Sequence, residues 1–134
     1  MPVLDTDIIV GVFRNNRDAI EKIKEIELSS SDRATTTVSA FELFEGAYRS
    51  DDSKRGKGLS FVREFLNSMD NVYIFDEESS EIAGKIMADL QRKGTPLDLA
   101  DVMIAAITIR NKDYLISRNK KHFSRIEELT LREW

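Results

Sequence analysis

The chain has 134 residues, of which 41% are hydrophobic, enough for one compact domain with its own core. It has no cysteine, which excludes disulfides, thiolate nucleophiles and cysteine-ligated zinc and is compatible with a reducing compartment. The net charge of −4 gives no overall basic character, so any argument for nucleic-acid binding depends on local charge. We expect residues 1–134 to form one domain.

The N-terminal stretch MPVLDTDIIVGVF is only partly apolar and carries Asp5 and Asp7 where a signal peptide would be most hydrophobic. No apolar run approaches the roughly 20 residues that cross a bilayer. We therefore expect a cytoplasmic protein with no membrane partner.

Strands and helices alternate along the first half of the chain. Apolar residues 2–4 predict a buried strand that ends at Asp5, and residues 16–27 predict an amphipathic helix. Residues 33–38 favour a strand, and Ser39 followed by Glu42 is typical of a capping box that opens the next helix. After a polar connection at residues 50–57, helical spacing resumes over residues 59–69.

The second half continues this alternation. Residues 72–75 predict a strand, residues 82–90 a helix that stops near Gly94, and residues 99–109 a helix buried on most sides. Residues 114–117 predict a fourth strand and residues 129–131 a short edge strand. The pattern predicts an α/β fold: a mostly parallel sheet covered on both faces, with its site beyond the carboxyl ends of the strands.

Asp5 and Glu42 are expected at this edge of the sheet, and each also has an ordinary structural interpretation. An aspartate between a strand and a helix commonly caps the helix, and the glutamate of a capping box bonds back to the backbone. Asp98 can likewise cap the helix that follows it. Asp101 is harder to explain, because it lies within the apolar segment LADVMIAAI, where no basic residue is near in the sequence.

Carboxylates gathered from separate segments at one sheet edge would repel one another unless cations lay between them. Mg²⁺ or Mn²⁺ prefers oxygen ligands and assists the hydrolysis of phosphodiesters by water. The only histidine, His122, leaves no pair of histidines for metal-independent acid–base catalysis. Nearby basic residues could contact phosphates: Lys54, Arg55 and Lys57 in one connection, and Arg118, Lys120 and Lys121 beside Asn119.

Four segments together resemble a PIN-domain ribonuclease of the VapC toxin type, and the resemblance spans nearly the whole chain. They are LDTD, TTVSAFELFEGAY, DLADVMIAAITI and YLISRNKKHFSRI. The resemblance implies a three-layer α/β/α sandwich and a metal-dependent RNA endonuclease, the toxin of a toxin–antitoxin pair. It further implies a small VapB-type antitoxin as partner and a homodimer.

By this resemblance, Asp5, Glu42 and Asp101 match three acidic site residues of the family, with Asp5 and Asp101 as the metal ligands, and Thr6 supports the site. The family's fourth acidic position falls at Asn119, which carries no charge. We expect Asp98 to compensate as an additional acid.

Two other interpretations stay open. LDTD is also similar to the first motif of haloacid dehalogenase-type phosphatases, but in that family the final acidic pair follows a strand, whereas Asp98 and Asp101 open a predicted helix. The neutral Asn119 is compatible with a non-catalytic module that binds RNA or protein.

Overall fold

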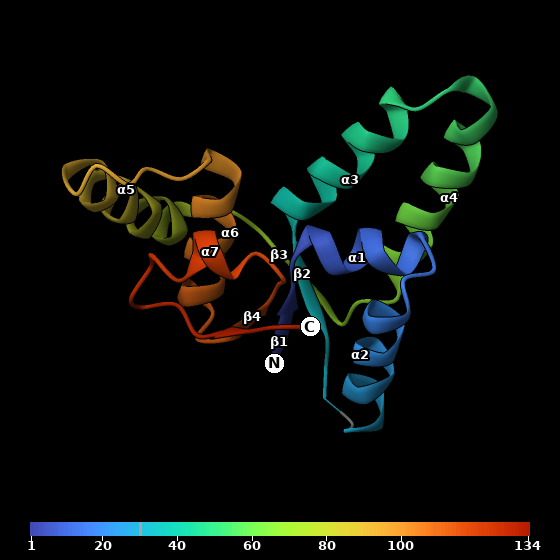
Figure 1. Ribbon diagram of the computed structural model, residues 1–134, viewed down its shortest axis with the longest axis horizontal. Coiled ribbons are helices and arrows are strands. Elements are labelled where there is room, and N and C mark those ends of the chain that lie inside the picture. Colours follow the sequence, from blue (N-terminus) through green and yellow to red (C-terminus); the bar gives the residue numbers. More distant parts are fainter. Residues whose placement is uncertain (30) are drawn as a thin grey trace.

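A five-stranded, wholly parallel sheet forms the centre of the molecule in the computed structural model, which describes residues 1–29 and 31–134 (Figure 1). The strand order is β3-β2-β1-β4-β5. The strands are short: β1 (Pro2–Leu4), β2 (Ala34–Thr36), β3 (Asn71–Tyr73), β4 (Tyr114–Ile116) and β5 (Leu131–Arg132). The central strand β1 pairs with β2 on one side and with β4 on the other. Its carboxyl end therefore lies in the middle of the sheet edge at which the site is predicted.

Within the described residues, seven helices cover the two faces of this sheet. They are α1 (Thr6–Phe13), α2 (Arg17–Leu28), α3 (Thr37–Arg49), α4 (Asp52–Asn67), α5 (Glu77–Arg92), α6 (Leu99–Arg110) and α7 (Lys120–Phe123). One core packs α1, α2, α3 and α4 around Leu4, Ile8 and Ile116, and the other packs α5, α6 and α7 around Val3, Ile104 and Leu115. The three-layer α/β/α sandwich with a parallel sheet is therefore confirmed.

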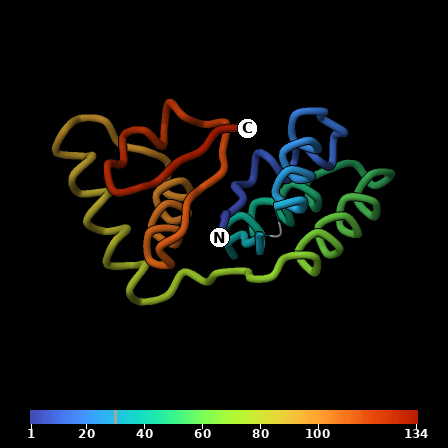
Figure 2. The backbone as a smooth tube through the Cα atoms, turned by 90° about the horizontal axis from the view of Figure 1, so that it is seen from below, coloured from blue at the N-terminus to red at the C-terminus, as the bar shows by residue number. Residues whose placement is uncertain are grey.

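The two helical layers lie on opposite sides of the sheet and are joined by an edge segment. The chain leaves α4, runs along one side of the molecule through β3 and enters α5 (Figure 2). In the part of the chain that the structure describes, no helix combines the length and the apolar character needed to cross a bilayer.

The structure contains one helix that was not predicted, and two local predictions are wrong. The apolar run after Asp5 forms the separate helix α1, which the sequence pattern did not reveal. The predicted capping box does not form, because helix α3 begins at Thr37 and its N-cap is Thr36, whose hydroxyl accepts the Ser39 amide at 3.0 Å. The predicted polar connection at residues 50–57 is largely helical, since α4 already begins at Asp52.

Candidate active site

Asp5 occupies the junction between the central strand and helix α1. Its Oδ1 accepts the backbone amide of Thr6 at 2.8 Å, and its Oδ2 accepts the hydroxyl of Ser117 at 2.7 Å. The residue is only 5% exposed, because β1 lies at the centre of the sheet and Ser117 covers it from the end of β4. Asp5 therefore caps α1 and also places a buried carboxylate at the carboxyl end of β1.

The surroundings of Asp5 oppose its negative charge. Burial and the nearby carboxylate of Asp7 raise the pKa of Asp5 from 3.8 to about 7, although the hydrogen bonds from Ser117 and Thr6 act in the opposite direction. The charge of Asp101 contributes further to this increase. A cation placed among these acids would remove the penalty.

Thr6 connects α1 to Glu42 of α3. Its hydroxyl donates to Glu42 Oε1 at 2.7 Å and lies 3.0 Å from the hydroxyl of Ser39. Glu42 therefore bonds to a side chain on the neighbouring helix instead of to its own helix terminus. This contact directs the glutamate toward the end of β1.

Asp101 lies on the first turn of α6 and has a partner that the sequence pattern did not reveal. The Nδ1 atom of His122, on α7, is 3.3 Å from Asp101 Oδ2 and 2.9 Å from the amide nitrogen of Asn119. Burial raises the pKa of Asp101, while the hydrogen bond and the charge of His122 lower it. The only signal in the sequence was the three-residue spacing of Asn119 and His122, which fits one face of a helical turn.

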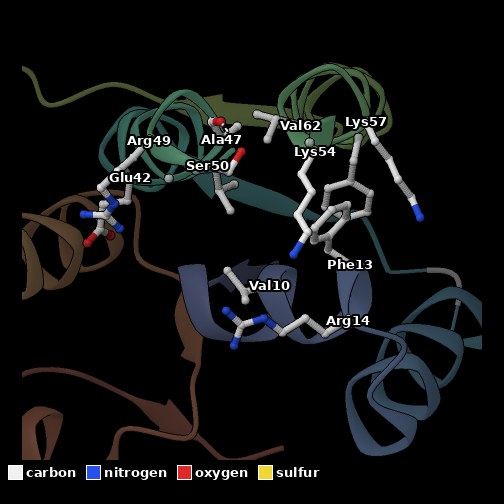
Figure 3. Close-up of a pocket in the computed structure, with 14 residues that line it drawn as sticks. Val10, Phe13, Arg14, Glu42, Ala47, Arg49, Ser50, Lys54, Lys57 and Val62 are labelled. Atoms are coloured by element: carbon white, nitrogen blue, oxygen red, sulfur yellow. Dashed lines mark hydrogen bonds between the residues drawn. The ribbon is translucent and has the colours of Figure 1, made fainter. Parts of the chain in front are cut away.

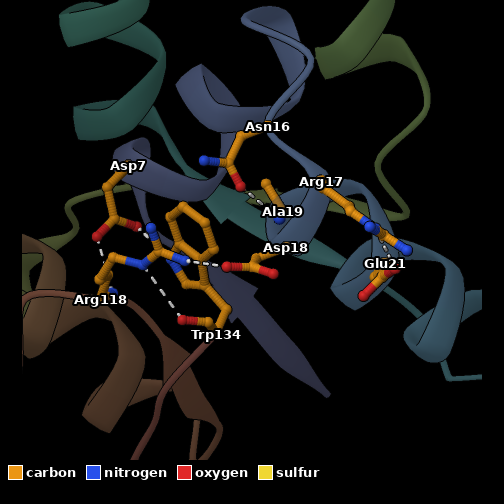
Figure 4. Close-up of polar contacts among 8 residues, drawn as sticks. All are labelled: Asp7, Asn16, Arg17, Asp18, Ala19, Glu21, Arg118 and Trp134. Atoms are coloured by element: carbon orange, nitrogen blue, oxygen red, sulfur yellow. Dashed lines mark hydrogen bonds and ion pairs between the residues drawn. The ribbon is translucent and has the colours of Figure 1, made fainter.

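Asp7 is the centre of a second set of contacts, which sequence reasoning also missed (Figure 4). Its Oδ1 accepts the indole N–H of Trp134 at 2.9 Å, and its Oδ2 accepts the backbone amide of Arg118 at 2.8 Å. The guanidinium of Arg118 lies 3.6 Å from the ring centroid of Trp134 and pairs with Asp18 at 3.2 Å. These contacts hold the last residues of the chain against α1 and α2.

The four acids Asp5, Asp7, Glu42 and Asp101 line one open cavity of about 580 Å³. Four of the five predicted catalytic residues are among the lining side chains: Asp5, Glu42, Asp101 and Asn119. Asp98, the fifth, does not line the cavity; it is exposed at the N-cap of α6, and only its charge acts on Asp101. The cavity thus combines clustered carboxylates with the cationic side chains of Arg14 and Arg118.

Comparison with known proteins decides what kind of fold carries this cavity. The PIN domain family matches residues 3–129. The chain belongs to the PIN-domain family. The predicted resemblance is thereby confirmed, and with it the reading of LDTD as a nuclease motif is favoured over the phosphatase interpretation.

Individual PIN-domain relatives are similar over almost their whole length. The "tRNA(fMet)-specific endonuclease VapC" of Salmonella typhimurium is 27% identical over 98% of this chain and 96% of its own. The "Ribonuclease VapC" of Rickettsia bellii is 30% identical over 95% and 91%. A crystal structure of DNA-bound VapBC from Salmonella typhimurium superimposes with a TM-score of 0.88 at 26% identity, covering 99% of this chain and 97% of the other.

The donor set of this PIN domain fits a hard divalent cation. Among the described residues, no three histidine, aspartate or glutamate side chains are grouped closely enough to form a complete protein cage for a metal ion. Mg²⁺ does not need such a cage, because it keeps several waters and usually binds through one or two carboxylates. Asp5 and Asp101 face the same cavity and meet that requirement. The charge of Asp101, like that of Asp7, adds to the increase that burial causes in the pKa of Asp5.

The basic residues beside Asn119 contribute unequally to the cavity. Arg118 lines it, whereas Lys120 turns to Glu133, 3.3 Å away, and the exposed Lys121 is not part of the lining. Lys54 and Lys57 belong to helix α4 and line a neighbouring groove.

Proposed function

We propose that this PIN domain is a metal-dependent endoribonuclease and the toxin of a type II toxin–antitoxin pair. The observation that carries the proposal is the convergence of Asp5, Glu42 and Asp101 on one cavity from three separate segments of the chain. The ribonuclease and endonuclease names of its full-length relatives support the same activity. We also propose that residues 1–134 form a single nuclease domain.

Each site residue has a defined task in the proposed reaction. Asp5 and Asp101 would hold Mg²⁺ or Mn²⁺, and the bound ion would supply positive charge for the phosphate undergoing displacement. Ser117 and the Thr6 amide fix the orientation of Asp5, and His122 does the same for Asp101. Water adds across one phosphodiester bond of the RNA, and no covalent enzyme intermediate is required.

Glu42 and Asn119 complete the polar wall of the cavity. Glu42 is held by Thr6 at 2.7 Å, so its second oxygen is left to orient water or a ligand of the ion. The side-chain amide nitrogen of Asn119 lies 2.9 Å from His122 Nδ1, and Asn119 contributes no charge, which leaves the site with fewer anions than a fully acidic one. Asp98 acts only at long range, by adding to the negative field at Asp101.

The proposed partners are a VapB-type antitoxin and a second copy of the chain. The solved structures similar to this fold include VapBC complexes. Helix α3 exposes Phe41 (67%) and Tyr48 (56%), which lie two turns apart on one face of the helix. Neighbouring aromatic side chains exposed in this way are typical of a surface that contacts another protein chain. Light scattering of the wild type and of Phe41→Glu/Tyr48→Glu tests the homodimer: loss of dimer mass only in the variant supports this face.

Cleavage of single-stranded RNA tests the activity. Purified wild type is incubated with Mg²⁺ or Mn²⁺, with EDTA, and beside Asp101→Asn; Asp89→Asn on the distant α5 serves as the matched control. We expect cleavage by wild type and Asp89→Asn in the presence of the ion, and none by Asp101→Asn or with EDTA. Equal cleavage by Asp101→Asn would refute the assigned site, and binding of RNA without cleavage under any ion would favour the non-catalytic module.

A further inference from the structure

A groove adjoins the catalytic cavity between α1, α3 and α4, and it is called the α1–α3–α4 groove here. Its volume is about 510 Å³, within the range of roughly 300–1,000 Å³ typical of ligand sites. Val10, Arg14 and Glu42 line both the groove and the catalytic cavity, so the two are continuous. A polymer whose scissile bond lies at Asp5 can therefore extend into the groove.

The groove carries positive charge in a protein that is negative overall. Its walls hold four cations and one carboxylate, namely Arg14, Arg49, Lys54, Lys57 and Glu42. Arg49 pairs with Glu45 at 3.1 Å, whereas the other three cations make no ion pair within the described residues. Figure 3 shows Lys54 extending from α4 toward α1, with Arg14 on the opposite side near Val10. This concentration of charge suits a phosphate backbone.

The same groove has an aromatic surface. Phe13 of α1 and Phe61 of α4 contact each other with ring centroids 4.8 Å apart, and Phe13 is 39% exposed. Flat apolar side chains beside cations are the combination with which proteins bind single-stranded nucleic acids, because bases stack on the rings while the cations contact phosphates.

We propose that the α1–α3–α4 groove binds the single-stranded RNA next to the bond that is cleaved. Phosphates lie at Lys54, Lys57 and Arg14, and a base packs against Phe13. The inference rests on the proposed ribonuclease activity and adds the path of the substrate. Continuity with the catalytic cavity favours RNA over a peptide as the occupant, because a substrate must continue beyond its scissile bond.

Gly46 offers a way to block the groove with little change to the fold. It lies on α3 in the groove wall, and a Cβ added to it would meet no atom within 4 Å. Gly84 on α5 is equally open and lies outside the groove, so Gly84→Leu is the matched control for Gly46→Leu. Lys85→Glu/Lys93→Glu on α5 matches the charge change of Lys54→Glu/Lys57→Glu.

The test uses the full chain and a fluorescently labelled single-stranded RNA of eight nucleotides. Binding is measured by anisotropy in EDTA at several salt concentrations, and cleavage is measured with Mg²⁺. We expect Lys54→Glu/Lys57→Glu to raise the Kd about tenfold and to reduce the slope of log Kd against log salt by about 1.4, since each phosphate contact on a single strand contributes about 0.7. Gly46→Leu should raise KM with little change in kcat, and both α5 controls should behave as wild type.

The outcomes separate this proposal from the activity on which it rests. If wild type fails to cleave, the ribonuclease assignment fails, while the binding measurements still decide whether RNA occupies the groove. If wild type cleaves and the groove variants bind RNA as their α5 controls do, the groove proposal is overturned and the nuclease remains. If the groove variants no longer bind a co-expressed antitoxin but bind RNA as wild type does, the groove proposal is also overturned, in favour of a peptide occupant.

Discussion

The hydroxyl of Ser117 donates to Asp5 Oδ2 across 2.7 Å, although 112 positions separate the two residues in the sequence. The pairing of β1 with β4 brings them together, since Leu4 and Ile116 are partners in the register. Ser117 is completely buried, so its hydroxyl replaces water as the donor to this carboxylate. The pKa of Asp5 nevertheless rises to about 7, which means that desolvation outweighs the hydrogen bonds.

Replacement of Asp5 by asparagine should change the pH dependence of stability. The folded protein keeps the Asp5 proton up to a pKa of about 7, whereas an ordinary aspartate loses it near 3.8. Ionisation of Asp5 therefore lowers the free energy of unfolding as the pH rises through this window, by up to about 4 kcal/mol. In EDTA, Asp5→Asn should raise the melting temperature relative to wild type more at pH 8 than at pH 4.

Thermal melts from pH 4 to pH 8 measure this difference. Any loss of stability that the asparagine causes equally at both pH values cancels in the comparison. Asp89→Asn, on the surface of α5, is the control and should shift the melting temperature equally at both ends of the range. An equal shift for Asp5→Asn at pH 4 and pH 8 would show that Asp5 has an ordinary pKa.

Thr6→Val should impair the site without unfolding the protein. The substitution keeps the shape of the side chain but removes the 2.7 Å bond to Glu42, which costs about 1 kcal/mol of stability. We expect kcat to fall about tenfold, equivalent to about 1.4 kcal/mol of lost positioning. Thr6→Ser should retain most of the activity, and Thr37→Val, at an exposed position of α3, should retain all of it. Wild-type kcat in Thr6→Val would mean that Glu42 needs no support.

Asn119→Asp should tighten the binding of divalent ions. The new carboxylate would face the cavity next to His122 and Asp101 and add one negative charge to the site. The Mg²⁺ concentration that gives half-maximal cleavage should therefore decrease. Asn67→Asp, at the end of α4 and outside the lining of the cavity, adds the same charge and should leave this concentration unchanged. An unaltered Mg²⁺ requirement in Asn119→Asp would place Asn119 outside the ion's surroundings.

The fluorescence of Trp134 should report ion binding independently of catalysis. It is the only tryptophan in the chain, and it lines the cavity together with Asp5 and Asp101. Titration with Mn²⁺, a paramagnetic ion, should quench its emission, and excess Mg²⁺ should restore it. Asp101→Asn should weaken the quenching, whereas Asp89→Asn should not. Quenching of the same strength in Asp101→Asn would locate the ion elsewhere.

Much of the fold was predictable because its elements carry strong periodic patterns. The strand before Asp5, the amphipathic α2 and the apolar α6 are found within one or two residues of their predicted positions. Helix α1 was missed because it is short and buried on several sides, so no polar face marks its period. The beginning of α3 was misplaced because Thr36 and Ser39 are both good capping residues, and only the structure shows which one caps.

The positions of Asp5, Glu42 and Asp101 along one cavity were predictable, whereas Asp98 does not line it and the hydrogen-bond partners of the acids were not predicted. A carboxylate in an apolar segment, such as Asp101, stands out because a charged side chain is seldom buried without a partner. The contacts that relieve this cost, Ser117 to Asp5 and His122 to Asp101, join residues far apart in the sequence. Their pairing depends on the strand order, which local patterns do not specify.

The position of β4 has a consequence for the time at which the protein becomes active. The strand that completes the sheet beside β1 begins only at Tyr114, and Ser117 and His122 follow it. On the ribosome, the chain therefore carries Asp5 on an incomplete sheet edge until the segment that contains β4 and α7 has emerged. A nascent chain without this segment has neither Ser117 beside Asp5 nor His122 beside Asp101, so we expect the acids to reach their final arrangement only after α7 has emerged from the ribosome.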